Sequence, residues 1–359
     1  MPKDKVIVGM SGGVDSSVAA ALLKEEGFEV IGVTMKIWGG ETLGIEGAHH
    51  ACYGPGEIED IEDAKKVAEI LRIPFYTVDL KQEYKTDVLD YFFNEYLSGR
   101  TPNPCVVCNR KVKFNALVKR ARADGIEFDY FATGHYAQVE YNKTRDRHLL
   151  KKAIDSNKDQ SYFLYSLSQE QLSHTIFPLG DYTKEEVRKI ARDLGLGIND
   201  KPESQNFIAG GYSSFFKSSA QPGSILNKQG EILGKHRGIP FYTIGQRRGL
   251  GISSGERLYV TAIDPERNTI MVGTKKDVFG DELIATKLNW IAMEKLKPIK
   301  VKAKIRYLHK ETEAEVVPLG EEKIRVKFRE PQMAITPGQA VVFYDGDIVV
   351  GGGVIERRI

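Results

Sequence analysis

The chain has 359 residues, of which 41% are hydrophobic and 28% are charged. These values are ordinary for a globular protein and exclude a collagen-like, low-complexity or wholly disordered chain. The 51 basic and 49 acidic side chains give a formal net charge of +2, which excludes a uniformly cationic coat for nucleic acid but leaves room for a local basic stripe. No apolar run approaches the roughly 18 residues of a membrane span and no signal peptide is recognisable, so we expect a cytoplasmic protein without membrane contact.

Short apolar runs alternate with helical patterns through the first half of the chain. Residues 5–10 predict a buried strand, and residues 16–26 predict a helix that stops at Gly27. Further elements are expected as strands at 30–35, 75–78 and 130–134 and as helices around 61–71, 88–96 and 117–122. This order predicts a doubly wound, Rossmann-like parallel α/β sheet, in which ligands bind beyond the carboxyl ends of the strands.

The pattern changes after a helix that the capping box of Thr183 and Glu186 predicts. From about residue 210, short alternating segments broken by glycine and proline predict two small β-barrels, with strands at 241–244, 257–260 and 269–272. We therefore expect a catalytic α/β domain over residues 1–209, a small central β domain over 210–276, and a C-terminal β-barrel over 277–359.

A glycine-rich loop, Ser11-Gly12-Gly13-Val14-Asp15-Ser16-Ser17, joins the first predicted strand to the first helix. The two glycines allow a tight turn with inward N–H groups, and the helix start adds the positive end of its dipole, which together favour a phosphate. A kinase-like loop would carry a lysine here, whereas the acidic Asp15 suggests a bridging Mg²⁺. A plain turn with Ser and Asp as helix caps is the alternative, and it explains a glycine pair better than the whole string.

With this loop the sequence resembles the ATP pyrophosphatases, whose Ser-Gly-Gly-x-Asp-Ser loop holds ATP while a substrate attacks the α-phosphate. The resemblance implies AMP and pyrophosphate as products. Members of that family make amides, lysidine, arginine precursors or thiolated nucleotides, so the loop alone leaves the substrate open.

Cysteine chemistry is the second chemical signal. Cys105 and Cys108 have a spacing that permits a disulfide, shared metal binding or sulfur transfer, and the spacing does not choose among them. A structural zinc ion usually has four ligands, and the remaining cysteine, Cys52, lies next to His49 and His50. An odd total of three cysteines argues against a secreted disulfide framework.

Basic residues follow the cysteine pair at Arg110, Lys111 and Lys113. Nearby positive charge stabilises a thiolate, so we expect thiol pKa values below the usual value of about 8.5. A lowered pKa suits a nucleophile or a persulfide carrier.

The loop and the cysteine segment together resemble the tRNA-specific 2-thiouridylase family of bacterial enzymes, which replace the C2 oxygen of the wobble uridine, position 34, with sulfur. The resemblance covers nearly the whole chain and is carried by residues 9–16, 34–35, 109–114, 132–137, 158–162 and 242–251. It implies adenylation of the uridine C2 oxygen, sulfur transfer, and release of AMP and pyrophosphate. It also implies ATP and Mg²⁺ as cofactors, the lysine, glutamate and glutamine tRNAs as partners, and a cysteine desulfurase or sulfur-relay protein as sulfur donor.

The resemblance also assigns residues to these roles. Cys108 is the expected nucleophile, with Cys105 and Cys52 as further catalytic candidates. The expected ATP contacts are Gly9, Met10, Ser11, Gly12, Gly13, Val14, Asp15, Ser16, Met35 and Gly134. The expected tRNA contacts are Asn103, Pro104, His135, Lys158, Asp159, Gln160, Arg306, Tyr307 and Gln339.

One departure from the family pattern affects the mechanism. The commonest pattern has aspartate where this chain has Cys105, and a second catalytic cysteine in a stretch that here, at residues 203–208, has none. The missing persulfide role then falls to Cys105, Cys52 or an external donor. Either one cysteine of the pair carries a persulfide and the other resolves it as a disulfide, or Cys52, Cys105 and Cys108 hold three irons of a [4Fe-4S] cluster; we favour the first.

The basic stretch from Lys295 to Lys310 contains no acidic residue. Between Lys300 and Arg306 the positive charges fall on every second position. A strand would present them on one face, with Val301, Ala303 and Ile305 in a barrel core, as a stripe that follows RNA phosphates. An ordinary solvated strand face is the alternative.

Two other functions fit part of these observations. One is an ATP pyrophosphatase that acts on a small molecule, such as an amide-forming synthetase. The other is a tRNA-binding protein without catalytic activity. Loss of 2-thiouridine from the tRNA of a deletion strain would discriminate among all three functions.

Overall fold

The computed structural model describes residues 3–40, 51–198, 201, 206–208, 215–216, 219–294 and 297–359. Contacts between residues divide the chain into two units. Unit 1 comprises Met1–Val88, Cys105–Gly211 and Gly346–Val349, and unit 2 comprises Leu89–Pro104, Tyr212–Asp345 and Val350–Ile359. The glycine-rich loop and all three cysteines belong to unit 1. The division into three domains predicted from the sequence stays a prediction.

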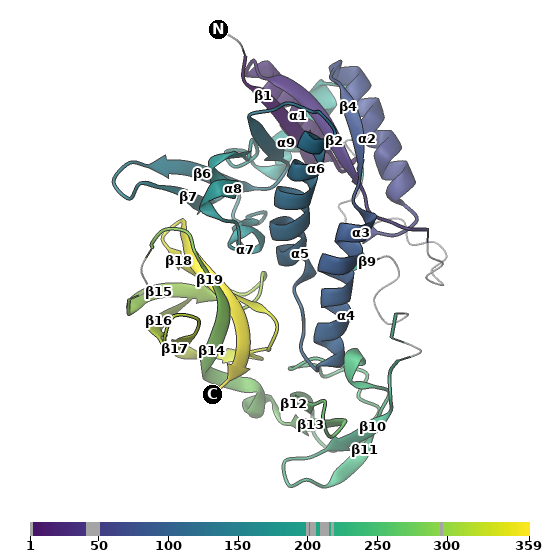
Figure 1. The fold of residues 1–359 in the computed structure, drawn as a ribbon. Helices are drawn as coiled ribbons and strands as arrows, with labels where there is room; N and C mark the ends of the chain where they lie inside the picture. The colour runs from purple at the N-terminus through teal and green to yellow at the C-terminus, as the bar shows by residue number, and fades with distance from the viewer. Residues whose placement is uncertain are drawn as a thin grey trace. The chain divides into compact units, whose positions relative to one another are not determined.

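Unit 1 is built on a five-stranded parallel sheet in the order β4-β2-β1-β5-β8 (Figure 1). The strands are β1 Lys5–Gly9, β2 Glu29–Lys36, β4 Phe75–Asp79, β5 Tyr130–Thr133 and β8 Thr175–Ile176. Chain order changes direction at β1, so the carboxyl ends of β1 and β5 lie side by side at the point where doubly wound folds bind ligands. The predicted parallel α/β sheet is confirmed.

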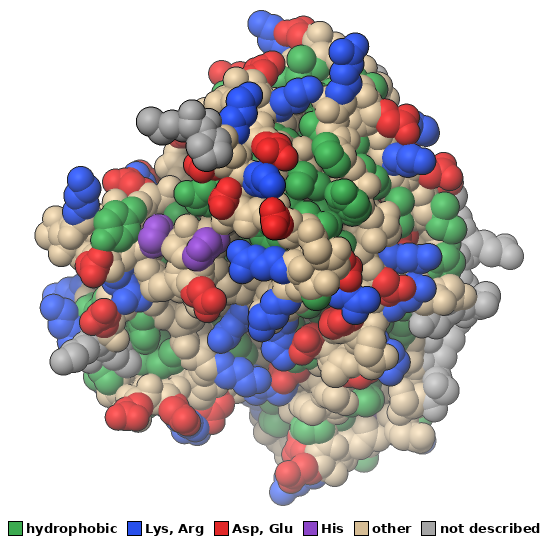
Figure 2. Space-filling view, turned by 45° about the horizontal axis from the view of Figure 1, so that its top comes forward, with side chains coloured by type: hydrophobic (Ala, Val, Ile, Leu, Met, Phe, Trp, Pro, Cys, Tyr) green, Lys and Arg blue, Asp and Glu red, His purple; other side chains and the backbone are tan. Residues whose placement is uncertain are grey.

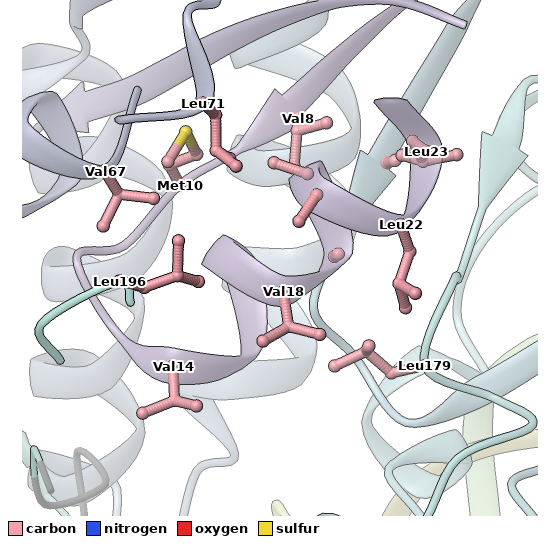
Figure 3. Packing of buried hydrophobic residues seen from close by; sticks show 14 of the residues in the cluster. Val8, Met10, Val14, Val18, Leu22, Leu23, Val67, Leu71, Leu179 and Leu196 are labelled. Atoms are coloured by element: carbon pink, nitrogen blue, oxygen red, sulfur yellow. The ribbon is translucent and has the colours of Figure 1, made fainter. Parts of the chain in front are cut away.

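Three helices cover one face of this sheet: α1 Val14–Glu25, α2 Glu57–Leu71 and α9 Lys184–Asp193. Their apolar side chains pack in one cluster with Val8 and Met10, to which α1 contributes Val18 and Leu22 (Figure 3). The capping box predicted for α9 is confirmed, because the side chains of Thr183 and Glu186 each bond to the backbone of the other.

The opposite face carries one continuous helical run. It consists of α5 Pro104–Val107, the π-helix η2 Cys108–Leu117 and α6 Val118–Ala123. Phe114 of η2 packs edge-on against Phe131 of β5, with 5.2 Å between ring centroids. Only the end of this run was predicted from the sequence, and its π-helical geometry was not, because i to i+5 hydrogen bonding leaves no simple periodicity of apolar residues.

Shorter elements complete unit 1. They are β3 Ala51–Tyr53, α3 Lys81–Tyr84, η1 Lys85–Leu89, the hairpin β6 Ala137–Asn142 and β7 Arg147–Lys152, α7 Ser161–Leu164, α8 Gln169–Ser173 and β9 Asn206–Ile208. The two short strands β3 and β9 pair in parallel. Because Cys52 lies in β3, this pairing gives the third cysteine a defined position.

Unit 2 contains a four-stranded sheet and a closed six-stranded barrel. The sheet has the order β11-β10-β13-β12, with β10 Gly223–Leu226, β11 Ile232–His236, β12 Tyr259–Asp264 and β13 Thr269–Gly273. The barrel runs β14-β17-β16-β15-β18-β19 and closes by pairing of β14 with β19; its strands are β14 Phe279–Trp290, β15 Ile299–Lys304, β16 Thr312–Pro318, β17 Ile324–Met333, β18 Ala340–Asp345 and β19 Ile348–Arg358. The predicted C-terminal barrel is confirmed.

One predicted strand of unit 2 is wrong. Phe241 ends a 3₁₀ helix, η4 Ile239–Phe241, and residues 242–244 form no strand. Pro240 lies in its first turn, and proline fixes φ near the helical value and has no N–H to give to a sheet. Helix α4, Asp90–Leu97, packs nearby through Phe92 and Phe93, whose rings contact Phe216.

The alternation predicted for the basic stretch is confirmed as far as Lys304, where β15 ends; the predicted place of Arg306 on the same strand face is wrong, because Arg306 lies beyond the strand. Lys300 and Lys302 on β15 are exposed, whereas Ala303 and Ile305 belong to the barrel core. Across the sheet, however, these lysines lie opposite Glu315 and Glu313 of β16. The stripe is therefore partly balanced by acidic neighbours, and Lys295 lies outside the described residues.

None of the helices in the described ranges combines the length and the apolar character that crossing a bilayer requires. On the face drawn in Figure 2, lysine and arginine side chains lie among aspartates and glutamates. A near-neutral total charge thus corresponds to mixed signs on this face.

The barrel core gives a test of the packing in unit 2. Phe343 is fully buried and stacks on Trp290, with 5.8 Å between ring centroids. We expect Phe343→Ala to lower the free energy of unfolding by about 3–5 kcal/mol, because it leaves a cavity. Denaturant titration followed by Trp290 fluorescence, in a Trp38→Phe background, measures this change. Phe279→Ala, at a 38% exposed side chain, should cost about 1 kcal/mol or less, and equal losses at both positions would contradict the packing described.

Candidate functional site

Serine side chains brace the glycine-rich loop from within. The N-cap of α1 is Gly13, and no side chain caps this helix. Ser16 and Ser17 instead donate their hydroxyls to the carbonyl of Gly13, at 3.2 and 2.9 Å, and Ser16 Oγ accepts from the N–H of Ser11 at 3.1 Å. The helix-cap interpretation therefore does not describe this loop, and the N–H groups of the first turn of α1 point toward the carboxyl end of the sheet without a side-chain cap.

At position 12 the neighbouring helix α2 leaves no room for a side chain. Its φ is +70°, and a Cβ atom there would lie 2.2 Å from the carbonyl oxygen of Asp60 in α2. The start of α2 is itself anchored, since Lys201 Nζ bonds to Asp60 and Asp63 at 2.7 Å each. A rigid helix thus fixes how closely the loop can approach it.

The carboxyl end of β5 packs directly on the loop. A Cβ atom on Gly134 would lie 2.5 Å from the backbone nitrogen of Ser16 and 2.6 Å from the carbonyl carbon of Asp15, so only glycine fits. The next residue, His135, contacts the ring of Phe114 on η2, with 6.0 Å between centroids. Gly134 and His135 therefore connect the loop to the π-helix that carries the buried cysteine.

A cation lies beside the loop although the loop itself has none. Lys184 Nζ bonds to both carboxylate oxygens of Asp15, at 2.7 and 2.8 Å, and its side chain is only 11% exposed. The hydroxyl of Tyr136 donates to the same carboxylate at 2.9 Å. Sequence reasoning missed Lys184 and Tyr136; the capping box places Lys184 at a helix start, but nothing in the sequence pairs it with Asp15.

The three cysteines form one electrostatic cluster. All are free thiols; Cys52 and Cys105 are exposed and Cys108 is buried. Burial, followed by the charges of Cys108, Cys52 and Cys105, raises the pKa of Tyr84 well above its usual value. Tyr84 also stacks on Tyr53, next to Cys52, with 5.5 Å between ring centroids. The structure thus brings together the three cysteines that the sequence analysis singled out.

The expectation of lowered thiol pKa values is wrong. Burial raises the pKa of the Cys108 thiol to about 11, although Lys113 pulls it down. Close packing likewise raises the pKa of Cys105 to about 12, helped by the charges of Cys52 and Cys108, even though the residue is exposed. Desolvation disfavours the charged thiolate more than Lys113 favours it. The sequence shows the basic residues but not the burial.

His135 is held as a neutral ring. Burial, together with the charge of Lys113, lowers the pKa of His135 well below its usual value. Its Nδ1 is hydrogen bonded to Thr133 Oγ1 at 2.7 Å. Its role as a tRNA contact stays a prediction.

The other predicted tRNA contacts of unit 1 lie in the loop after β7. Asp159 is buried and accepts hydrogen bonds from Ala153 and Ser161, so it shapes the loop. Gln160 accepts from the backbone N–H of Tyr136 at 2.9 Å, which ties this loop to the end of β5. Lys158 is half-buried in the same turn.

In unit 2 several predicted tRNA contacts have bonds within the protein. Gln339 Nε2 donates to the carbonyls of Thr101 and Pro102 at 3.0 Å each, which holds the segment that leads to Asn103 and Pro104. Arg306 Nη2 donates to Thr336 Oγ1 at 2.7 Å and to the carbonyl of Ala334 at 3.0 Å. The ring of Tyr307 lies 5.8 Å from Lys304 Nζ. Their binding to tRNA stays a prediction.

No group of three or more His, Cys, Asp or Glu side chains in the described ranges is arranged to hold a metal ion. The predicted neighbours His49 and His50, and residues 203–205 of the stretch that lacks the usual cysteine, lie outside those ranges. Met10 is buried next to the loop, and Met35 is half-buried near the carboxyl end of β2.

Comparison with protein-family models matches three consecutive segments. Residues 4–209 match the tRNA methyl transferase HUP domain, 215–274 the tRNA methyl transferase PRC-barrel domain, and 280–355 the aminomethyltransferase beta-barrel domain. A curated relative from Caldanaerobacter subterraneus subsp. tengcongensis, named tRNA-specific 2-thiouridylase MnmA 1, is 54% identical over 99% of both chains. The chain belongs to the tRNA-specific 2-thiouridylase family.

Two more curated relatives agree with this membership. The MnmA proteins of Acetivibrio thermocellus and Desulforamulus reducens are 50% and 48% identical, over 99% of this chain and 100% and 98% of theirs. Among solved structures, a 4-thiouridine synthetase–RNA complex with bound ATP aligns at 19% identity and TM-score 0.34, over 60% of this chain and 49% of that one. An NMN synthetase from Francisella tularensis aligns at 16% identity and TM-score 0.35, over 60% and 73%.

The buried thiols give a pH test of the site. Iodoacetamide reacts with the thiolate, and both pKa values lie far above neutrality, so we expect the alkylation rates of Cys105 and Cys108 to rise about tenfold per pH unit from about pH 7 to 10. Mass spectrometry of the two peptides against time measures these rates. A rate that levels off near pH 7 would mean that the thiols ionise easily and would contradict the effect of burial.

Proposed function

We propose that this protein uses ATP to replace the C2 oxygen of the wobble uridine of tRNA with sulfur. The observation that carries the proposal is the contact path in unit 1 from Asp15 and Ser16 through Gly134 and His135 to the π-helix of Cys108. A phosphate loop and a sulfur centre on one such path can act on one base. Membership of the 2-thiouridylase family supports the same reaction.

The first step proposed is adenylation. The C2 oxygen attacks the α-phosphorus of ATP, the bond to pyrophosphate breaks, and AMP becomes attached to the base. We propose that the uncapped N–H groups of α1 and the loop hold the phosphates, while Lys184 contributes positive charge where negative charge accumulates. For the C2 oxygen to reach the α-phosphorus, the wobble uridine must leave its stack of bases in the tRNA.

The second step proposed is sulfur transfer through the cysteine pair. Exposed Cys105 accepts a sulfur atom from the donor and becomes a persulfide, whose terminal sulfur attacks C2 and displaces AMP. Buried Cys108 then attacks the inner sulfur, so the S–S electron pair leaves with the sulfur on C2 and a Cys105–Cys108 disulfide forms. A thiol reductant restores both thiols. This route needs no cysteine in the stretch at residues 203–208.

The cofactors proposed follow from the same residues. Asp15 would be the protein carboxylate that holds the Mg²⁺ of the bound ATP, which suits an ion that usually takes only one or two carboxylates, and the ion would offset negative charge on the phosphates. Lys184 and Tyr136 orient that carboxylate. The described part of the chain holds no group of three side chains arranged as metal ligands, and the proposal therefore uses no [4Fe-4S] cluster.

The partners proposed are the lysine, glutamate and glutamine tRNAs and a sulfur donor such as a cysteine desulfurase or a sulfur-relay protein, in the cytoplasm. A reconstituted reaction tests the whole proposal. Purified protein, ATP, Mg²⁺, a cysteine desulfurase with cysteine, a thiol reductant such as dithiothreitol, and an unmodified tRNA transcript should give 2-thiouridine at position 34 by nucleoside mass spectrometry. ATP cleavage that thiolates no tRNA would favour the small-molecule alternative.

The cysteine roles are tested by matched serine variants. We expect Cys108→Ser to lower thiolation at least a hundredfold while ATP binding is unchanged, because the persulfide can no longer be resolved. Cys52→Ser is the control and should keep most of the activity. Thiolation by purified Cys108→Ser protein at the wild-type rate would refute the assignment.

The loop geometry is tested by two glycine variants. Gly12→Ala must move the loop away from Asp60, so we expect ATP to bind at least about tenfold more weakly by calorimetry. The control is Gly27→Ala. Gly27 has a φ of +96° but open space where a Cβ atom would lie, so the substitution should lower only the free energy of unfolding, by about 1–2 kcal/mol. Unchanged ATP affinity in Gly12→Ala would show that the loop does not bind the nucleotide.

A further inference from the structure

The π-helix determines which basic residue lies over the buried cysteine. Cys108 and Lys113 are the first and sixth residues of η2, five positions apart. In a π-helix residues i and i+5 are joined by a backbone hydrogen bond and, at about 4.4 residues per turn, their side chains lie about 50° apart around the axis. In an α-helix, at 100° per residue, the same two side chains would be about 140° apart around the axis. The π geometry therefore brings Lys113 to the same side of the helix as Cys108.

A glutamine from a neighbouring helix holds this geometry. Gln171 Nε2 donates to the carbonyls of Arg110 and Phe114, at 2.9 and 3.0 Å, both inside η2. Its Oε1 accepts from the backbone N–H of Ser168 at 2.9 Å, as part of the capping box of α8. The amide is thus fixed at both ends, and it binds the π-helix on either side of Lys113.

The other two basic residues of the segment point elsewhere. Arg110 and Lys111 are exposed, and Lys111 pairs with Asp87 at 2.7 Å. Lys113 is partly buried; burial alone would lower its pKa, but the charges of Cys108, Cys52 and Cys105 raise it. Lys113 also acts on His135, which burial keeps uncharged. The charge of Lys113 therefore interacts chiefly with the three thiols.

We propose that Lys113 is a positioning residue of the sulfur chemistry: the π-helix holds its ammonium beside Cys108, where it stabilises negative charge on sulfur. A buried anionic sulfur is unfavourable unless a partner offsets the loss of water. Lys113 is that partner each time Cys108 is deprotonated for attack. The role of Lys113 in thiolation rests on the proposed function. The effect of Lys113 on the reactivity of the Cys108 thiol does not.

Alkylation of the purified full chain tests the inference. In Lys113→Met we expect Cys108 to react with iodoacetamide roughly tenfold more slowly at pH 8.5, since loss of one pKa unit of stabilisation is tenfold in thiolate. Lys113→Arg keeps the charge and should recover at least about half of the lost rate. Lys111→Met, on the exposed face, should match the wild type. Equal Cys108 rates in wild type and Lys113→Met overturn the proposal.

Two further measurements separate this inference from its alternatives. Lys113→Met should retain the wild-type melting temperature and ATP affinity, because it removes a charge and leaves the glycine-rich loop untouched. If the melting temperature falls together with the alkylation rate and Lys113→Arg restores neither, Lys113 has only a structural role and the proposal is overturned. Gln171→Leu should also slow the alkylation of Cys108, since the π-helix loses the two hydrogen bonds from Gln171 to the carbonyls of Arg110 and Phe114. Failure of the reconstituted thiolation in the wild type would refute the proposed function while leaving these alkylation results to stand.

Discussion

The close packing of Gly134 on the glycine-rich loop is the constraint on which the site depends. With no side chain at Gly134, the end of β5 reaches the backbone of Asp15 and Ser16, and the following two residues extend in different directions. Tyr136 returns to the carboxylate of Asp15, and His135 reaches the π-helix. A parallel sheet whose order changes direction at β1 makes this possible, because the ends of β1 and β5 are neighbours there.

Burial gives the sulfur centre its chemical character. Thiols that are hard to ionise are protected from unwanted oxidation and alkylation, since the thiolate is the reactive form. The same burial makes each reactive sulfur anion depend on a nearby cation, and the π-helix brings Lys113 to the side of the helix that carries Cys108. The glycine-rich loop likewise depends on a cation from elsewhere in the sequence. The loop has no basic residue of its own, and Lys184 at the start of α9 pairs with Asp15.

The sequence predicted the features that repeat along the chain and missed those that depend on contacts between distant residues. The parallel sheet, the start of α9 and the alternation on β15 follow from local periodicity and capping, and all three are confirmed. The π-helix, the burial of Cys108 and the pairing of Lys184 with Asp15 join residues far apart in the chain or depart from standard helix periodicity. The strand expected at residues 241–244 failed because Pro240 favours a 3₁₀ turn over sheet hydrogen bonding.

Isotope transfer tests most directly whether the nucleotide and the sulfur centre act on the same base. A tRNA transcript with oxygen-18 at C2 of the wobble uridine is incubated with the protein, ATP and a sulfur donor, and the released AMP is analysed by mass spectrometry. Attack of the C2 oxygen on the α-phosphorus predicts that AMP carries the label in proportion to the 2-thiouridine formed. Labelled oxygen that appears in water, or stays in the tRNA while ATP is consumed, would contradict the account.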